Sequence, residues 1–531
     1  MTATALVARL ISCCLAACTA GALAQGATPA PPDPAPATAA RFDILEYRVE
    51  GNSVLPAATI EEAVYPHLGE SRSIDDVESA RRSLEDAYRR AGFLSVSVDV
   101  PEQRVEGGVV RLQVVEGRVN RLRVRNNRWF SAGSIVSRLP SIAEGSVPDF
   151  NRLQVELAGV AGADRSISPS LKAGRLPGTL DIDLAVEDRI PLRANVELNN
   201  YHNAGATPWR LGASMRYDDL FERQHSLSAQ FLVTPSQPSE LKVGSVTYAL
   251  PVGERRDTLA FYWLESRSES LSGAGIGLST ILGNQRVFGL RLARPLGEAA
   301  GLQHQLTLGV DHKRTGIDVS GASSDTSPVD YTPFTIAWTG LRADRRGVDR
   351  FDASLLFSVR GLGNDPAEFP QRRYQADASY ALLRLDGTVE RPLGTWRLRA
   401  RAVAQLAGQP LLAYVQFALG GALTARGYFE SEFLGDAGLA ASVELGAPRW
   451  MPWGERIELR PVFFADGGTA VVREPLPEQR DRLTLASIGA GLRVQFPPRV
   501  TGSIDAARAM RDGVATERGD VRVTARLLAE F

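Results

Sequence analysis

The chain of 531 residues is poor in cysteine, and its few cysteines lie at one end. Cys13, Cys14 and Cys18 all fall within the first 18 positions, so a chain cleaved after Ala24 would carry no thiol at all. Disulfides, cysteine-based zinc sites and cysteine nucleophiles are thereby excluded from the rest of the sequence.

The sequence also lacks an excess of either charge and lacks long apolar runs. Its 60 basic and 61 acidic residues give a net charge of -1, so nucleic acid is not an expected partner. Beyond the first 24 residues, no uninterrupted apolar stretch reaches the roughly 18 residues of a candidate transmembrane helix. If this chain enters a membrane, it must do so as a closed β-barrel, because that fold also satisfies every backbone polar group in lipid.

Catalytic signatures are missing as well. The five histidines are dispersed along the chain at His67, His202, His225, His304 and His312. There is no HExxH spacing, no G-x-S-x-G turn and no Walker loop. We therefore expect no catalytic residues, no cofactor and no metal.

Residues 1–24 have the pattern of a secretory signal. Arg9 precedes an apolar run, and Ala22-Leu23-Ala24 before Gln25 fits an A-x-A cleavage site. We expect cleavage between Ala24 and Gln25, and export of the mature chain. An alternative stays open, because Leu15-Ala16-Ala17-Cys18 resembles a lipoprotein cleavage box that would leave Cys18 as a lipidated N-terminus.

A linker and then an internal repeat follow the signal. Residues 25–41 are too rich in proline for a helix and too poor in large apolar residues to pack, which predicts an extended linker. From Phe42 onward a pattern recurs with an offset of 75 residues. The matching segments are Leu45–Asn52 and Asn120–Asn127, followed by Leu55, Ile60 and Val64 in the first copy and by Phe130, Ile135 and Leu139 in the second. A fixed offset predicts two copies of one supersecondary unit.

Each copy is predicted to run strand, helix, helix, strand, strand. In the first copy the patterns place strands at 45–49, 94–100 and 109–115 and helices at 59–67 and 73–92. The second copy repeats this order, with a helix at 150–160 and strands at 167–171 and 180–186. The unit is therefore an α+β module of the order β-α-α-β-β.

The second helix of the first copy carries the clearest local signals. Ser73 is a candidate N-cap with Asp76 three residues on, and Gly92 is a candidate C-terminal stop. Apolar residues recur on one helical face at Ile74, Val77, Leu84, Ala87, Tyr88 and Ala91. This face is predicted to pack on the sheet.

Beyond residue 189 the helical signal fades, and short alternating stretches recur between clusters of Gly, Pro, Asp and Ser. The last stretch is the clearest. Its apolar face holds Val521, Val523, Ala525, Leu527, Ala529 and Phe531, and its other face holds Arg522, Thr524, Arg526 and Glu530, with Leu528 as the exception. One face suits lipid and the other a wet lumen, which predicts an antiparallel transmembrane β-barrel.

Several motifs in the repeat resemble those of a known family. These are the β-α-α-β-β order, the Gly51-Asn52 turn, the segment Tyr88–Phe93, and Val100–Gln103 ahead of Glu116-Gly117. Together they resemble the POTRA modules of TpsB-type two-partner secretion transporters, outer-membrane proteins that export haemolysins and filamentous adhesins. The alternative is a pair of generic α+β domains.

The resemblance implies a domain layout. POTRA 1 would span 42–117, POTRA 2 would span 118–188, and the barrel would span 189–531. It also implies sixteen strands, which allows about 21 residues for each strand and its connection, although twelve or fourteen strands also fit this length. The aromatic residue at the end of the last strand, Phe531, resembles the signal read by the outer-membrane barrel-assembly machinery.

Two further segments match motifs of the same family. Segment 424–428 (TARGY) is similar to the V/I-R-G-Y/F motif at the tip of the sixth extracellular loop, with alanine in place of the usual larger aliphatic residue, and segment 464–468 (FADGG) is similar to a strand motif. In the family that loop folds back into the pore and its arginine meets the strand aspartate. The residues of this predicted latch are Arg426, Gly427, Tyr428, Phe464, Asp466 and Gly468.

The predicted latch has a physical reason. A guanidinium inside a barrel needs a partner, and a bidentate pair with a carboxylate can hold a long loop in a fixed geometry. The alternative is an exposed arginine in a turn and an unrelated aspartate facing the lumen.

The resemblance implies a secretion pore in the outer membrane. POTRA strand edges in the periplasm would bind an unfolded exoprotein by β-augmentation, the second module being the better candidate, and the barrel would pass it outward. The implied partners are the exoprotein, the barrel-assembly machinery and outer-membrane lipid. Rival functions are an insertase of the same superfamily, a passive porin and a barrel enzyme; two POTRA copies favour export, because known insertases usually carry three or more.

Family members often carry an N-terminal helix that plugs the pore. Residues 25–41 are short, rich in Pro and Ala, and have no amphipathic face. We therefore expect no stable helical plug, and closure of the pore mainly by the inward loop.

Overall fold

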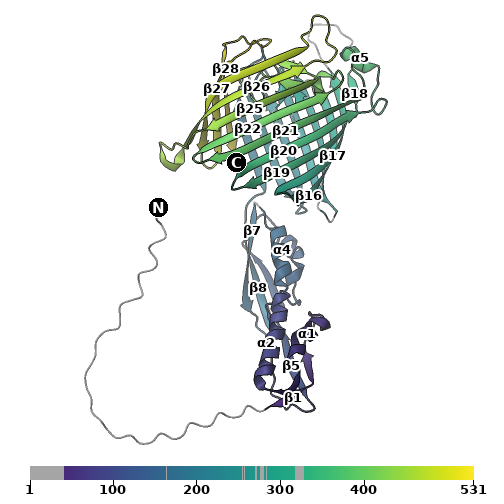
Figure 1. The fold of residues 1–531 in the computed structure, drawn as a ribbon, viewed down its shortest axis with the longest axis vertical. Helices are drawn as coiled ribbons and strands as arrows, with labels where there is room; N and C mark the ends of the chain where they lie inside the picture. The colour runs from purple at the N-terminus through teal and green to yellow at the C-terminus, as the bar shows by residue number, and fades with distance from the viewer. Residues whose placement is uncertain are drawn as a thin grey trace, which may run out of the picture. The chain divides into compact units, whose positions relative to one another are not determined.

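The computed structural model describes residues 41–531 except 163, 254, 256, 269–271, 275–279, 283 and 317–327. The predicted signal peptide with its cleavage site at Ala24 and Gln25, the alternative lipidation at Cys18, and the predicted linker up to residue 40 lie outside the described residues. The chain divides into two compact units, one holding most of the N-terminal helices and the other holding the large barrel (Figure 1). Among the described residues no helix is both long enough and apolar enough to cross a membrane.

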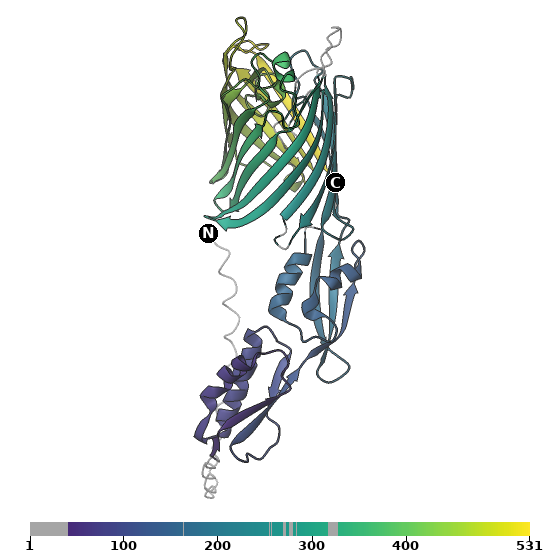
Figure 2. The same ribbon diagram turned by 90° about the vertical axis from the view of Figure 1, so that its right-hand side faces the viewer.

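The first α+β module has the predicted order. It consists of β2 (Glu46–Glu50), α1 (Ala57–Val64), α2 (Ile74–Arg90), β4 (Val96–Asp99) and β5 (Val109–Glu116). The sheet order is β2-β5-β4, with β2 parallel and β4 antiparallel to the central strand β5. Figure 2 shows helices α1 and α2 covering one face of this sheet, as the apolar face of α2 predicts.

Helix α2 begins where its capping box lies. The Ser73 amide and hydroxyl both donate to a carboxylate oxygen of Asp76, at 2.8 and 2.9 Å. Its buried residues are Val77, Ala80, Leu84, Ala87 and Tyr88. Ile74 was wrongly placed on the packed face and is 64% exposed, because it occupies the first helical position, at the edge of the apolar stripe.

The sequence patterns did not predict a second, smaller sheet in this module. Strand β1 (Phe42–Ile44) pairs antiparallel with β3 (Gly69–Arg72), and the Ser71 amide donates to a carboxylate oxygen of Asp43 at 2.8 Å. A short 3₁₀ turn, Tyr65–His67, precedes β3. Strands of three and four residues are too short to show a period of two.

The second module repeats the order with β6 (Arg118–Arg125), α3 (Ala132–Ser137), α4 (Phe150–Val160), β7 (Arg165–Ala173) and β8 (Thr179–Asp188). Its sheet order, β6-β8-β7, is the counterpart of that in the first module. A 3₁₀ turn, Pro140–Ile142, separates its helices. The predicted helix at 150–160 and the last two predicted strands are confirmed.

The turn after the first strand explains why the repeat is visible in sequence. In the first module the Asn52 side chain donates to the Leu55 carbonyl at 2.9 Å, and in the second the Asn127 side chain donates to the Phe130 carbonyl at 2.9 Å. Both asparagines therefore fix the same three-residue turn, and the apolar residue that closes each turn is buried.

The barrel is a closed antiparallel sheet of sixteen strands, as predicted. In ring order they are β9 (Leu192–Asn199), β10 (Arg210–Leu220), β11 (His225–Val233), β12 (Leu241–Val252), β13 (Asp257–Ser268), β16 (Asn284–Ala299), β17 (Leu302–Gly316), β19 (Phe334–Asp344), β20 (Gly347–Ser358), β21 (Tyr380–Leu393), β22 (Trp396–Ala407), β25 (Ala437–Gly446), β26 (Glu458–Val471), β27 (Arg482–Phe496), β28 (Val500–Ala509) and β29 (Val521–Glu530). Strand β29 pairs with β9 and closes the ring.

Shorter elements lie in the long connections. They are β14 (Ser272–Ala274), β15 (Thr280–Leu282), β18 (Val329–Tyr331), helix α5 (Glu368–Arg372), the 3₁₀ turns Ala413–Val415 and Gly454–Arg456, β23 (Phe417–Leu419) and β24 (Phe433–Gly435). Strand β18 pairs with the end of β17 that extends beyond β19, so it does not add a wall strand.

The two faces of the wall differ as the last strand predicts. In β29, Val521, Val523 and Leu527 are exposed, whereas Thr524 on the opposite face is buried. The same outward apolar face continues around the ring in exposed residues such as Leu308, Ile336, Leu355, Leu385, Val443, Phe463, Ile488 and Ile504. The residues that alternate with them along each strand face the lumen, and many of these are polar.

Candidate functional site

The connection between β22 and β25 enters the barrel instead of extending away from it. It joins the eleventh and twelfth wall strands, which makes it the sixth connection on the side of the long loops. Its strands β23 and β24 pair with each other, and Leu419, Ala425 and Tyr428 are buried against wall residues. A loop whose centre is this deeply buried has the lumen as its environment.

Arg426 lies at the tip of this loop and meets Asp466 on β26. Its Nε donates to Asp466 Oδ2 at 2.8 Å and its Nη2 to Oδ1 at 2.9 Å, which is a bidentate pair. The Arg426 backbone amide adds a third bond to Oδ2 at 3.0 Å. One carboxylate therefore fixes both the side chain and the backbone of the loop tip.

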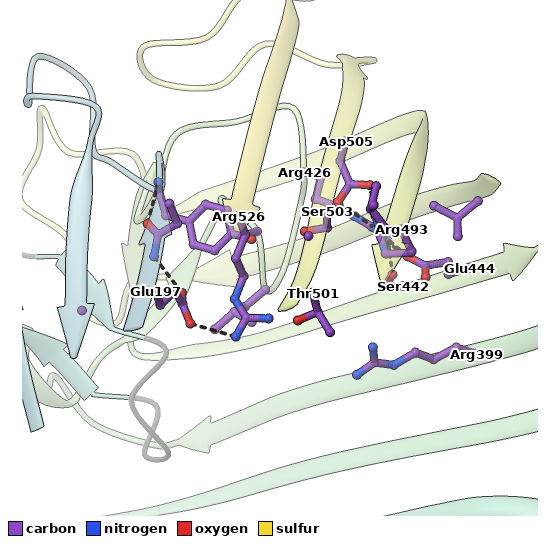
Figure 3. A pocket seen from close by; sticks show the side chains of 18 of the residues that line it. Glu197, Arg399, Arg426, Ser442, Glu444, Arg493, Thr501, Ser503, Asp505 and Arg526 are labelled. Atoms are coloured by element: carbon purple, nitrogen blue, oxygen red, sulfur yellow. Dashed lines mark hydrogen bonds and ion pairs between the residues drawn. The ribbon is translucent and has the colours of Figure 1, made fainter. Parts of the chain in front are cut away.

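Further polar residues complete the surroundings of Arg426. Its Nη1 donates to Glu444 Oε2 at 2.8 Å and lies 3.8 Å from Asp505, and its Nη2 donates to Ser442 at 3.1 Å. Arg493 bridges the two outer carboxylates, at 2.8 Å from Glu444 and 2.5 Å from Asp505. Figure 3 shows these side chains gathered on one side of the lumen.

Phe464 contributes an aromatic face. The Arg426 guanidinium carbon lies 3.4 Å from the centre of the Phe464 ring, and Phe464 and Asp466 share the inward face of β26. A cation held over an aromatic ring in a desolvated site gains about 2 kcal/mol or more. The ring therefore supports the same arginine that the carboxylates bind.

Two glycines permit the close approach of loop and wall. Gly427 has φ of +100°, a conformation that residues with a side chain rarely adopt. A Cβ at Gly468 would lie 2.6 Å from Leu419 Cδ1 and 2.8 Å from the Leu439 carbonyl oxygen. Both positions of the motifs therefore have a steric reason to be glycine.

Tyr428 ties the loop to a neighbouring connection. Its hydroxyl lies 2.8 Å from the carbonyl oxygens of Ala486 and Arg511, and the Arg511 amide donates to it at 3.2 Å. Arg511 belongs to the connection between β28 and β29. The six residues of the predicted latch thus lie together in one buried cluster of loop and wall.

The sequence patterns missed a second anchor of the loop, Glu432. Its Oε1 accepts from the amides of Val514, Ala515 and Thr516 at 2.9, 2.7 and 2.8 Å, and its Oε2 accepts from the Thr516 hydroxyl at 3.0 Å. A glutamate within a loop has no spacing that would single it out. Its role depends on a turn of backbone amides more than 80 residues away.

A third anchor holds the end of the loop. Asp436 is fully buried, pairs with Arg373 at 2.6 Å, and accepts from the amide of Leu411 at 2.9 Å and the side chain of Gln416 at 3.0 Å. The amide of Arg473 donates to the same carboxylate at 2.6 Å. The loop is therefore attached at its tip, on its returning arm and at its base.

Beside the latch the lumen holds a cavity of about 900 Å³. Charged residues of both signs line it, among them Arg399, Glu444, Arg460, Arg526 and Glu197. Arg526 pairs with Glu197 at 2.8 Å across the β29–β9 junction, away from the Arg426 cluster (Figure 3). Within the described ranges, no group of three or more His, Cys, Asp or Glu side chains is arranged to hold a metal ion.

Phe531 follows the last wall strand. Its amide donates to the Ala194 carbonyl at 2.8 Å, the Ala194 amide donates to the Phe531 carbonyl at 3.3 Å, and its ring is exposed. The hydrogen bonds extend the β29–β9 pairing by one step. Its role as an assembly signal stays a prediction.

Comparisons with known proteins agree with this architecture. The sequence profile of haemolysin secretion/activation proteins of the ShlB/FhaC/HecB type matches residues 178–494, more than half of the chain, and the profile of the ShlB-type POTRA domain matches residues 42–117. The outer membrane transporter CdiB of Escherichia coli O6:K15:H31 is 20% identical over 428 residues, which cover 77% of this chain and 70% of that protein.

A second relative matches over a shorter stretch, and a solved structure matches over most of the chain. The heme/hemopexin transporter protein HuxB of Haemophilus influenzae (strain 86-028NP) is 21% identical over 188 residues, and the match spans 34% of this chain and only about a third, 32%, of that protein. The solved structure of CdiB from Escherichia coli has a TM-score of 0.58 and 18% identity, with 94% of this chain and 93% of that chain covered.

BamA from Haemophilus ducreyi lacking POTRA domains 1-3 has a TM-score of 0.57 and 14% identity, with 92% of this chain and 100% of that chain covered. At these identities the two structures establish a shared fold only. The two profile matches establish the family as well as the fold. This chain belongs to the haemolysin secretion/activation protein family ShlB/FhaC/HecB, outer-membrane β-barrel transporters with periplasmic POTRA domains.

Proposed function

We propose that this transporter binds an unfolded exoprotein in the periplasm and secretes it through the lumen of its barrel. The observation that carries the proposal is the loop that Arg426 holds inside the lumen. A cavity of about 900 Å³ lies beside this loop, so displacement of the loop would widen the path through the barrel. The printed names of relatives, outer membrane transporter and heme/hemopexin transporter protein, support a transport role. Chemistry on the cargo forms no part of this role.

Capture of the cargo is assigned to the edges of the POTRA sheets. In the second module β6 and β7 are the edge strands, and most side chains of β7 are exposed. An exposed edge presents a row of unpaired amides and carbonyls that an extended segment can pair with, and such pairing demands little of the cargo sequence. This supports an unfolded chain as the substrate.

The latch is proposed to hold the resting pore partly closed. Arg426 joins the loop tip to Asp466 and Glu444, while Glu432 and Asp436 attach the arms that follow. Cargo entering the lumen has to displace these contacts or pass beside them. Arg426 and Asp466 are thus gating residues for transport.

Depletion of this protein tests the function. The proteins of the culture medium and of the outer membrane are compared between depleted cells, cells complemented with the wild-type chain, and cells complemented with an empty vector. Loss of one large secreted protein is the expected result. Loss of many outer-membrane barrels would instead assign the chain to barrel insertion, and unchanged profiles of both fractions would contradict export.

A further inference from the structure

An ionic cluster lies on the outward face of the barrel, where neighbouring residues are apolar. Arg342 on β19 is directly opposite Asp349 on β20, and Arg391 on β21 reaches the same carboxylate. These strands lie side by side in the wall (Figure 1). Arg342 lies on the same face of β19 as Ile336, and Arg391 lies on the same face of β21 as Leu385. Ile336 and Leu385 are exposed apolar residues of the outer face.

The cluster has more positive than negative charge. Arg391 binds Asp349 through both terminal nitrogens, one at 2.9 Å from Oδ2, and Arg342 binds Oδ2 as well. The carboxylate side chain is 2% exposed, whereas the two arginine side chains are 32% and 31% exposed. One buried carboxylate is therefore shared by two guanidiniums, and Arg391 Nη1 also donates to the Glu390 carbonyl at 2.9 Å.

The adjoining hairpin increases this excess. Asp344, Arg345 and Arg346 are exposed in the tight turn between β19 and β20. With the cluster they make four arginines against two aspartates, a net charge of +2 at one end of the wall. Burial of unbalanced charge near hydrocarbon is costly unless an anion accompanies it.

The depth of the cluster follows from strand geometry. At the other end of β19, the rings of Phe334 and Phe357 stack with centroids 5.5 Å apart on the outward face. Eight residues separate Phe334 from Arg342, which is about 26 Å along the strand and about 19 Å along the membrane normal at a tilt of about 45°. The apolar band of such barrels is about 25 Å tall, so Arg342 lies near its periplasmic edge.

Aromatic residues lie near the cluster on the outward face. Trp338 precedes Arg342 by four residues on β19, shares its outward face, and donates its indole N–H to His304 at 3.2 Å. Trp396 is exposed at the start of β22, beside the strand that carries Arg391. Tryptophan is enriched where hydrocarbon meets headgroups, since its ring is apolar and its N–H is polar.

We propose that Arg342, Asp349 and Arg391 form a binding site for the phosphate of an anionic phospholipid in the periplasmic leaflet. The guanidiniums supply donors in the fork geometry that suits phosphate oxygens, and Asp349 holds both of them at one place on the wall. The net charge of the cluster favours a lipid with a negative headgroup over a zwitterionic one.

The test measures lipid binding to the purified full-length protein by native mass spectrometry. Dioctanoyl phosphatidylglycerol is expected to bind about tenfold or more tightly than dioctanoyl phosphatidylcholine. The double variant Arg342→Gln/Arg391→Gln is expected to lose this preference. The matched control, Arg350→Gln/Arg399→Gln, removes two guanidiniums from the lumen face of β20 and β22 and is expected to keep it.

A second variant keeps the proposal falsifiable if the double variant misfolds. Asp349→Asn keeps an oxygen acceptor for the two guanidiniums but removes the negative charge that competes with a phosphate, so it is expected to strengthen phosphatidylglycerol binding. Equal binding of both lipids, an equal loss in the lumen control, or weaker binding by Asp349→Asn would overturn the proposal. Displacement of the lipid by inorganic phosphate at the same concentration would overturn it too, since the site would then recognise free phosphate.

Discussion

Arg426 uses nearly all of its hydrogen-bonding capacity within the lumen. Its Nε and both terminal nitrogens donate to Asp466, Ser442 and Glu444, and its backbone amide adds a further bond. Its side chain is 9% exposed, so these partners replace water almost completely. A lysine has three donors on one nitrogen and cannot reproduce a bidentate fork together with a bond to a second carboxylate.

Replacement of Arg426 tests this arrangement. In Arg426→Ala the carboxylate of Asp466 stays buried without its partner, which costs about 3–5 kcal/mol. We expect the loop to leave the wall, secretion of the cargo to be abolished, and the barrel to remain inserted; Arg426→Lys should give an intermediate loss. Secretion is followed in the culture medium and insertion by heat-modifiable migration on gels. Normal export by Arg426→Ala would contradict the gating role.

Two neighbouring glycines of β26 allow a test of whether close packing against the loop matters. Comparing alanine substitutions at both positions separates this effect from a general intolerance of β26 to substitution. In Gly468→Ala the new Cβ would meet the Leu439 carbonyl oxygen at 2.8 Å, whereas in Gly467→Ala the nearest atom is 3.6 Å away. We therefore expect Gly468→Ala to displace the loop and to raise the ion conductance of the pore in planar bilayers. Gly467→Ala should match the wild type, and equal effects of both would count against the steric argument.

Part of the site could be predicted from sequence and part could not. Arg426 and Asp466 lie in short motifs with glycine and an aromatic residue, which are recognisable without a structure. Glu444 and Arg493 are single charged residues on strands, and which face they occupy depends on a register that sequence alone does not give. Glu432 is still harder to identify, because its partners are backbone amides and leave no trace in residue type.

At the scale of elements, helix α2 has a cap that can be tested. The Ser73 amide and hydroxyl hold the pKa of Asp76 below its usual value, so the charged carboxylate is the form that caps the helix. Since the pKa of Asp76 is lowered by folding, the cap stabilises the helix above the unfolded-state pKa, and this contribution is lost as the pH falls through the folded-state pKa.

Removal of the cap should loosen the start of α2. In Ser73→Ala one acceptor and one donor of the capping box disappear, and such changes typically destabilise a helix by about 1 kcal/mol. We expect faster amide hydrogen exchange in residues 74–77 of the full-length protein. Ser79→Ala is the control, because Ser79 donates only to the Asp75 carbonyl on an exposed face. Unchanged exchange at 74–77 would show that the cap is dispensable.

The loop arm anchored by Glu432 gives a second test at this scale. Glu432→Ala leaves the amides of residues 514–516 without their acceptor, so the connection between β28 and β29 should exchange amide hydrogens faster. Glu478→Ala changes an exposed glutamate of another connection and should leave residues 510–520 as in the wild type. Equal exchange in both variants would argue that Glu432 does not order this segment.

The elements themselves were predictable to the extent that they are long and periodic. Helix α2, strand β29 and the sixteen-strand barrel follow from periodicity, capping and the family resemblance. The β1–β3 sheet was not predicted, because strands of three and four residues carry no period. Ile74 shows a related limit: its spacing fits the apolar face, yet its place at the first position of the helix leaves it in solvent.

At the scale of the whole molecule, the loop lies inside the lumen, and we propose that it obstructs the pore. We predict that Asp466→Ala has a larger single-channel conductance than the wild type, since its loop tip loses three hydrogen bonds at once. Asp352→Ala on β20, whose carboxylate accepts from Thr339 and Arg350, is the control and should conduct as the wild type does. A wild-type conductance for Asp466→Ala would assign closure of the pore to another segment.

The wall residues around Arg426 carry more negative than positive charge, and this affects how the loop would return to close the pore. When Arg426 withdraws, Asp466, Glu444 and Asp505 remain with Arg493 alone, and the vacated wall carries a charge of -2. At about 10 Å in water this attracts the departed guanidinium by only about 0.8 kcal/mol. Physiological salt screens such a field within about 8 Å. We therefore expect the loop to return by diffusion until Arg426 is within a few ångströms of the wall, where electrostatic attraction takes over. Added salt should slow this rebinding of Arg426 without altering the open pore.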